Sequence, residues 1–379
     1  MEISQNQAVQ INSTNDNSRN LTFDIAKGLG IVIIVLTHII ASQHFSFYFL
    51  LLFRVSLFFV ISGYFFKHLY CENLENLKIF IKKKIKTIYL PFVLTNLGCI
   101  LFHNFFFKIH LLTNNPLYSN MIGYREIYSG ITIIKKVLYN FVMYEFEVMV
   151  IPIWFLSALF WISICFCIGS FLLNKLIKKD RFFEPLRALI VLLCLGLGFY
   201  CYKTGFNFYR IGTMLSCATP FYIGVLYRKY AANLSLNIYT LIISFLILVI
   251  CNVFNPKHFE LVHNNYNNPF WLIITSIFGF IFIISISEFI KKKNEFLSKL
   301  FNYIGQNTVI ILCLHILSFK LVNVVQILFF GYTPSEKILS SYLIYNPHND
   351  LWCLAYLLAG IFVPCMIKEI YLRIKNALV

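Results

Sequence analysis

Two ionisable side chains in the first long apolar run have a spacing that could serve chemistry across a membrane. Lys27 and His38 lie eleven residues apart in a run of mostly Ile, Val and Leu. At about 100° per residue this separation is about three turns plus 20°, so both side chains lie on one helix face, roughly 16 Å apart along the axis. Asp24 lies within about 60° of Lys27 on that face. Such groups inside a span usually face the bundle interior and mark a functional path.

The chemistry of this face would be anion binding at one end and proton transfer at the other. A neutral imidazole is suited to general-base catalysis near pH 7. Each residue also has a structural interpretation, since a lysine near a helix end can anchor the helix by snorkelling and an interfacial histidine can bond to a neighbour. The shared face favours the functional interpretation. Gly28 and Gly30 would let a second helix or a thin ligand approach closely.

Two further residues are candidates for catalytic groups. Arg54 lies in the second apolar run and should face the bundle interior, because a guanidinium in lipid is costly. It could stabilise an oxyanion, or be a paired structural arginine. His315 lies seven residues after Thr308 near the middle of the ninth run, so the two share a face.

Lysines precede the third apolar run, immediately before Pro91. Lys83, Lys84 and Lys86 could bind the phosphates of a nucleotide-type cofactor as point charges. The alternative is the excess of positive charge typical of cytoplasmic loops, with contact to anionic lipid.

Trp154 and Glu147 are candidates for binding an acceptor substrate on the other side. Trp154 opens the fourth run, where a tryptophan is also an ordinary residue of the aromatic belt. Glu147 belongs to the long segment 108–152, which is rich in Tyr and charged residues. A long connection of this kind can be a binding loop or interfacial packing, and the sequence favours neither.

The elements that must position these residues are membrane-spanning helices. Hydrophobic residues make up 59% of the 379 residues and charged residues only 13%, against about 25% charge in soluble domains. The sequence therefore predicts an all-α polytopic integral membrane protein with about ten helices. The expected spans are 23–42, 46–66, 87–107, 153–174, 188–202, 211–227, 238–254, 270–290, 303–328 and 351–367.

Basic residues predict the orientation and the extent of the domain. With the N-terminus in the cytoplasm, 21 of the 32 Lys and Arg residues fall in inside segments and 8 in outside segments, which places both termini in the cytoplasm. Residues 1–22 read as a disordered polar tail and 23–379 as one membrane domain.

The net charge of +16 follows from this topology, so nucleic-acid binding is not expected. The eleven cysteines lack metal-ligand spacing, so no metal is expected.

Four segments together resemble the acyltransferase type 3 family of bacterial membrane proteins, and within it the fucose 4-O-acetylase-like branch. The segments run from Asp24 to His38, from Phe58 to Tyr64, from Trp154 to Leu156 and from Gly305 to His315. The resemblance implies a multi-pass protein of the bacterial inner membrane. It implies O-acylation of a glycan, lipid or antibiotic hydroxyl, mostly with acetyl groups from acetyl-CoA.

The resemblance also implies roles for particular residues. The family has an Arg or Lys, ten intervening residues and an essential His, which Lys27 and His38 match. Arginine is commoner at the first position, and lysine offers only a point charge there. The family's Arg-x-x-Arg pair would fall on Lys83 and Lys86, or on Lys84 and Thr87.

These inferences predict a membrane O-acetyltransferase acting on a cell-surface polysaccharide or its lipid-linked precursor. The pantetheine arm of acetyl-CoA would pass along the Gly28 and Gly30 face to His38. His38 would activate the acceptor hydroxyl for direct attack, or would itself carry the acyl group. The alternative is a transporter of glycan precursors or small acids, although transporters often contain internal repeats. The second half shows no convincing repeat of the segment from Asp24 to His38.

Overall fold

The computed structural model describes residues 20–40, 48–118, 124–177, 180–206, 208–254, 259–333, 335–344 and 350–377. Within these ranges the chain is helical, and its only β pairing consists of two isolated bridges. Of the predicted tail 1–22, residues 1–19 lie outside the described ranges, and the first helix already begins at Leu21.

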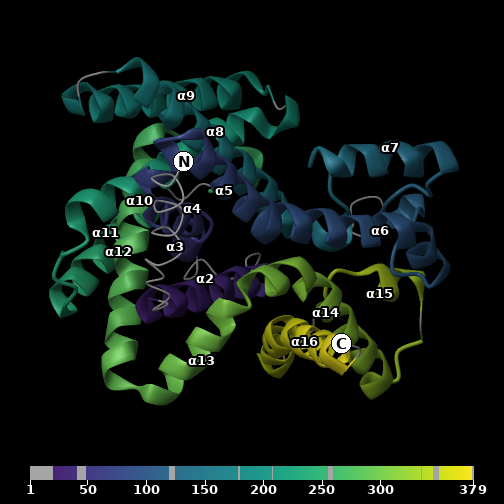
Figure 1. Cartoon of the computed structure of the whole chain (residues 1–379). Coiled ribbons are helices and arrows are strands. Elements are labelled where there is room, and N and C mark those ends of the chain that lie inside the picture. The colour runs from purple at the N-terminus through teal and green to yellow at the C-terminus, as the bar shows by residue number, and fades with distance from the viewer. Residues whose placement is uncertain are drawn as a thin grey trace.

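The helices follow the predicted apolar runs closely (Figure 1). They are α2 (Leu21–Ile40), α3 (Tyr48–Leu51), α4 (Ser56–Tyr64), α5 (Leu74–Lys84), α6 (Leu90–Lys108), α7 (Gly130–Phe141), α8 (Trp154–Leu176), α9 (Phe183–Thr204), α10 (Ile211–Leu226), α11 (Ile238–Phe254), α12 (Pro269–Lys293), α13 (Glu295–Gln306), α14 (Thr308–Phe330), α15 (Glu336–Ser340) and α16 (Asp350–Ala377).

Seven helical stretches in the described part of the chain are long and apolar enough to cross a bilayer. They comprise α2, the joined α5 and α6, α8 with the turn before it, α9, α12, α14 and α16. The other predicted spans correspond to α3 with α4, to α10 and to α11, which are shorter. The protein is therefore an all-α polytopic membrane protein, as the sequence predicts.

Helix α2 lies inside the bundle, against α12, α13, α14 and α16. Its closest neighbour is α13, because glycines face each other where the two helices meet. A Cβ atom on Gly28 would lie 2.1 Å from the carbonyl oxygen of Phe301, and one on Gly305 would lie 1.8 Å from that of Asp24. Gly30 faces the side chains of Leu57 and Phe58. Protein therefore fills the glycine face, and the predicted passage of a ligand along it is wrong.

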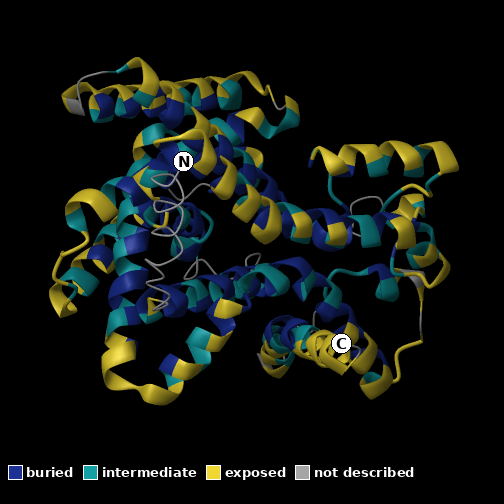
Figure 2. Ribbon diagram, in the orientation of Figure 1, coloured by how far each residue is buried: buried dark blue, intermediate teal, exposed yellow. Residues whose placement is uncertain are grey.

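Helices α7 and α9 lie at the periphery and expose much of their surface (Figure 2). On α7 the exposed apolar residues Ile131, Ile134 and Leu138 recur at helical spacing. An amphipathic helix of this kind lies in the interface plane of a membrane with its apolar face in the lipid. This part of segment 108–152 thus favours interfacial packing over a binding loop.

Candidate active site at the end of α2

A break in the second predicted span places Arg54. Instead of one helix over 46–66, α3 ends at Leu51, residues 52–55 form turns, and α4 begins at Ser56. Non-helical backbone at membrane depth is tolerated only where protein buries it or where it lines a cavity. Nη1 of Arg54 donates a hydrogen bond to the hydroxyl of Thr37, next to His38. The Thr37 hydroxyl in turn donates to the carbonyl of Ile34 over 2.9 Å.

The two predicted histidines lie side by side. The ring centroids of His38 on α2 and His315 on α14 are 5.3 Å apart. Nδ1 of His315 lies 2.9 Å from the carbonyl oxygen of Ile311 and 3.1 Å from that of Leu312. Carbonyls only accept hydrogen bonds, so Nδ1 carries the proton and Nε2 has a free lone pair. That Nε2 is buried and has no partner among the described residues.

His38, Arg54 and Trp154 line one small cavity at the end of α2. Its volume is about 90 Å³. Pockets that enclose a whole small molecule have volumes of about 300–1,000 Å³. This cavity can therefore hold reacting groups, such as a carbonyl, a methyl and a hydroxyl, but not a whole sugar. His315 does not line the cavity, although its ring lies next to that of His38.

Glu260 is a candidate that the sequence analysis missed. It lines the His38 cavity from the loop between α11 and α12. Nη1 of Arg210 holds that loop by donating to the carbonyl of Val262 over 2.7 Å, and Ser216 donates to Asn264 over 2.9 Å. No motif marks Glu260, because a residue in an irregular loop has no periodicity that would relate it to His38.

Tyr342 is a second residue that the sequence did not single out. It lies in the loop after α15, and its buried hydroxyl has no hydrogen-bond partner in the part of the chain described. Burial raises the pKa of the Tyr342 phenol, although the charge of Arg54 acts in the opposite direction. The phenol therefore keeps its proton at neutral pH and remains a donor near Arg54.

Lys27, Lys83 and Lys84 line a second, larger cavity of about 330 Å³ at the other end of α2. Nζ of Lys27 lies 2.8 Å from Asp24 and 5.2 Å from the ring centroid of Phe65. Lys84 donates a hydrogen bond to the hydroxyl of Ser62 over 3.2 Å. Phosphate-bearing groups can bind such a set of point charges.

Two residues predicted to bind a cofactor do not line this cavity. Asp24 forms an ion pair with Lys27, and Lys86 is exposed. Residues 85–89 form a π-helical turn between α5 and α6. Pro91 explains a disturbance here, because proline has no N–H to donate to the preceding turn. Such turns shift the register of side chains and are frequent at functional sites.

The two cavities are neighbours. Phe155 and Leu312 line both of them. A single layer of side chains therefore separates the space beside Lys27 from the space beside His38. These two residues belong to α8 and α14, so the cavities meet beside these helices rather than on the glycine face of α2.

Glu147 lies elsewhere, in a buried network on segment 108–152. Its carboxylate is 2.8 Å from Nδ1 of His103 and accepts from the Tyr128 hydroxyl over 2.9 Å. The Tyr128 ring stacks on the His103 ring, with 3.5 Å between the ring centroids. Burial and the neighbouring Glu147 carboxylate raise the pKa of Tyr128. The network ties the segment to α6, and Glu147 does not line the His38 cavity.

Comparison with known proteins gives one family. The model of the acyltransferase type 3 family, described as an acyltransferase domain, matches residues 20–369. No curated protein and no solved structure gives a significant match. The matched range contains all the residues that line the two cavities at the ends of α2.

Proposed function

The chain belongs to the acyltransferase type 3 family, and from this premise we propose that it is an O-acetyltransferase of the bacterial inner membrane. It would transfer an acetyl group from cytoplasmic acetyl-CoA to a hydroxyl of a cell-surface polysaccharide or its lipid-linked precursor. The sequence resembles the fucose 4-O-acetylase-like branch of this family, and we propose a sugar hydroxyl as acceptor for that reason.

One observation carries this proposal. A lysine-lined cavity and a histidine-lined cavity lie at opposite ends of α2, and Phe155 and Leu312 line both. Acyl transfer across a membrane needs an anion site on the donor side, a base on the acceptor side and a narrow connection between them. The excess of basic residues predicts that the Lys27 end faces the cytoplasm.

The lysine-lined cavity supplies the donor site in this proposal. Lys27, Lys83 and Lys84 would attract the phosphates of acetyl-CoA as point charges. Aromatic and aliphatic side chains, among them Phe58 and Leu159, line the rest of the cavity. These residues would contact the arm that carries the thioester toward Phe155.

The His38 cavity would hold the reacting groups. A ring nitrogen of His38 takes the proton of the acceptor hydroxyl, and the oxygen forms a bond to the thioester carbonyl carbon. Arg54 would stabilise the oxyanion that forms on the carbonyl oxygen. Collapse of the tetrahedral intermediate breaks the carbon–sulfur bond, and the coenzyme A thiolate recovers the proton. In the covalent alternative the acyl group rests on His38 before it reaches the acceptor.

The acceptor would approach from the outer face. The volume of about 90 Å³ leaves most of the sugar outside the cavity, where Trp154 and Glu260 line its wall. Glu147, which the sequence placed among acceptor-binding residues, would support segment 108–152 from within. The proposed chemistry requires no metal ion and no nucleic acid.

A transporter of glycan precursors or small acids is the second candidate. The breaks between α3 and α4, and between α13 and α14 at Asn307, resemble the interrupted helices of transporters. The family match and the small volume beside His38 favour transfer over passage of a whole solute.

Everted membrane vesicles with radiolabelled acetyl-CoA outside them distinguish the two. The enzyme should place label on glycan inside the vesicles, while vesicles with His38→Ala protein should not. Flux of a glycan precursor without any labelled glycan would refute the transferase and favour the transporter.

A further inference from the structure

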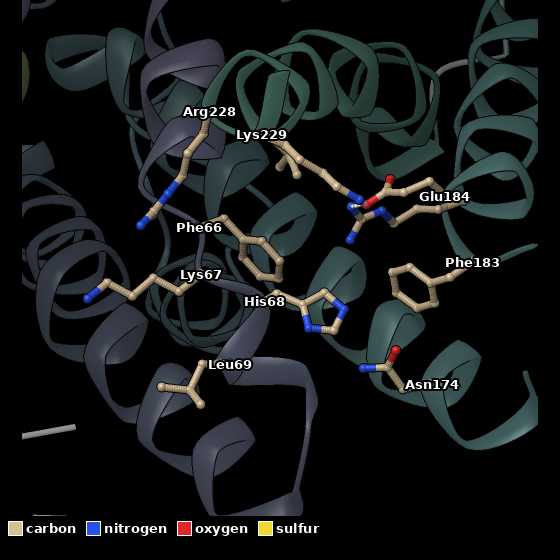
Figure 3. Close-up of a pocket in the computed structure, with 11 residues that line it drawn as sticks. Phe66, Lys67, His68, Leu69, Asn174, Phe183, Glu184, Arg228 and Lys229 are labelled. Atoms are coloured by element: carbon tan, nitrogen blue, oxygen red, sulfur yellow. Dashed lines mark hydrogen bonds and ion pairs between the residues drawn. The ribbon is translucent and has the colours of Figure 1, made fainter. Parts of the chain in front are cut away.

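A further cavity in the described part of the chain lies away from the α2 sites. It has a volume of about 680 Å³ and is bounded by the ends of α4, α8 and α10 and the start of α9. Figure 3 shows Lys67 and Arg228 on one side of it, Glu184 and Phe183 on the other, and Lys229 extending toward Glu184. By the distribution of basic residues this is the cytoplasmic end of the bundle.

Positive charge dominates the wall. Lys67, Arg187, Arg228 and Lys229 line the cavity, and Glu184 is the one carboxylate among its lining residues. Glu184 accepts hydrogen bonds from both Arg187 and Lys229, the latter over 3.1 Å. One carboxylate thus faces four cations, which leaves the cavity electropositive.

The burial of Arg187 is not explained by the excess of basic residues that sets the orientation of the protein in the membrane. Basic residues that only set orientation lie in water at the membrane surface, whereas Arg187 is 4% exposed. Its Nε and Nη1 are buried and donate to no acceptor in the described ranges. The guanidinium lies against the rings of Phe183 and Phe166, at 4.9 and 5.3 Å from their centroids.

A buried donor without an acceptor is costly, because it has lost its bonds to water. A guanidinium has a planar fork of donors that fits the oxygens of phosphate, and aromatic neighbours hold that plane in place. Lys229 and Arg228 would add point charges from the exposed rim. The site therefore has the chemistry of a phosphate-binding pocket.

We propose that this cavity binds a phosphate-bearing group through Arg187, Arg228 and Lys229. Two sources have this chemistry. One is the 3′-phosphate on the adenosine end of the acyl donor, whose diphosphate would lie beside Lys27, since Phe66 lines both cavities. The other is the head group of an anionic phospholipid. Binding of the acyl donor rests on the proposed function, whereas binding of an anionic phospholipid is independent of it.

The test compares two double variants in nanodiscs of phosphatidylcholine. Arg228→Gln with Lys229→Gln removes the exposed charges of the rim. Lys292→Gln with Lys293→Gln is the matched control, because these lysines lie on the same side at the end of α12 and outside the cavity. Calorimetric titration uses 3′-phosphoadenosine 5′-diphosphate as the probe, and adenosine as the probe without phosphate.

A second arm measures phosphatidylglycerol retained by each variant in native mass spectrometry. A tenfold or larger rise in Kd for the nucleotide in the rim variant, but not in the control, supports the nucleotide source. Loss of retained phosphatidylglycerol in the rim variant alone supports the lipid source. If both readouts match the wild type, the phosphate pocket is refuted.

Arg187→Lys tests the buried donor in the same two assays. Lysine keeps the positive charge but lacks the planar fork of donors. Whichever ligand binds more weakly to the rim variant should therefore also bind more weakly to Arg187→Lys. Wild-type values in this variant would remove Arg187 from the pocket. All these readouts are binding measurements without turnover. If the protein binds the nucleotide but transfers no acetyl group, the proposed function is refuted while the phosphate-binding pocket is still supported.

Discussion

At the scale of single residues, the neighbours of His38 define what its imidazole can do. His315 lies at 5.3 Å between ring centroids, and Arg54 bonds to Thr37, the residue before His38. His38 is half-buried, whereas His315 is fully buried. Only His38 can therefore meet a substrate in the cavity, and His315 would act as a neighbour that positions it.

Replacing His38 by Ala should lower the rate of acetyl transfer by about 10²–10⁴-fold, the usual contribution of a general base. Initial rates in washed membranes, corrected for protein amount, measure this. His110→Asn is the matched control, because His110 is exposed and Asn tolerates its φ of 58°. A rate for the His38 variant close to that of the control would exclude His38 as base and as acyl carrier.

Replacing Lys27 by Ala should raise the KM for acetyl-CoA with little change in kcat. A hydrogen bond to a charged group contributes about 1.5–3 kcal/mol, so the expected rise is about 10–100-fold. Lys86→Ala should have a much smaller effect, since Lys86 is exposed and does not line the cavity beside Lys27. Equal effects of the two variants would contradict the structural placement and favour a diffuse surface charge.

At the scale of elements, α2 and α13 are held together by backbone contact. Gly28 and Gly305 allow each helix to approach the carbonyl groups of the other. This contact orients the α2 face that carries Lys27 and His38. It also explains why a small residue is needed at Gly305, immediately before the break that starts α14.

Gly305→Ala should destabilise the protein by about 1–3 kcal/mol, the usual cost of an overpacked contact. The new Cβ would lie 1.8 Å from the backbone oxygen of Asp24, which cannot rotate away. Thermal unfolding in detergent measures the fall in Tm. Beyond its own stretch of α6, a Cβ on Gly98 meets no atom within 4 Å in the described part of the chain, so Gly98→Ala should leave Tm unchanged or raise it. A Gly305→Ala protein as stable as this control would contradict the close packing.

At the scale of the whole molecule, one layer of side chains separates the cavities at the two ends of α2. Phe155 belongs to that layer and lines both cavities. In the proposed reaction the donor binds on one side and the acceptor on the other, so the acyl group would have to pass this layer. The size of the residue at position 155 should therefore select the acyl chain.

Phe155→Ala should raise the rate with butyryl-CoA relative to acetyl-CoA by about 10-fold or more, since each methylene contributes about 1–3 kcal/mol to discrimination. Phe155→Trp should slow transfer while donor binding stays intact. Competition between the two donors gives the ratio directly. Phe160→Ala is the matched control, because Phe160 is equally buried on α8 and lines neither cavity. An unchanged ratio in Phe155→Ala would show that the acyl group takes another route.

The sequence alone determined the membrane class and the helices, because lipid requires long apolar runs with internally satisfied backbones. It also determined that Lys27 and His38 share a face, because helical periodicity is local. It could not determine that the second span breaks at residues 52–55, since tertiary packing supports that break. It could not place Glu260 or Tyr342 near Arg54, because these contacts join loops far apart in the chain.

Tertiary structure alone also decided what the glycines and lysines do. Gly28 admits a helix rather than a ligand, and the π-turn before Pro91 leaves Lys83 and Lys84 in the cavity but Lys86 outside it. Side-chain spacing gives the face of a helix, but which neighbour covers that face depends on how the other helices pack. The chemical character of these residues could therefore be predicted from the sequence, whereas their neighbours depend on how the helices of the bundle pack.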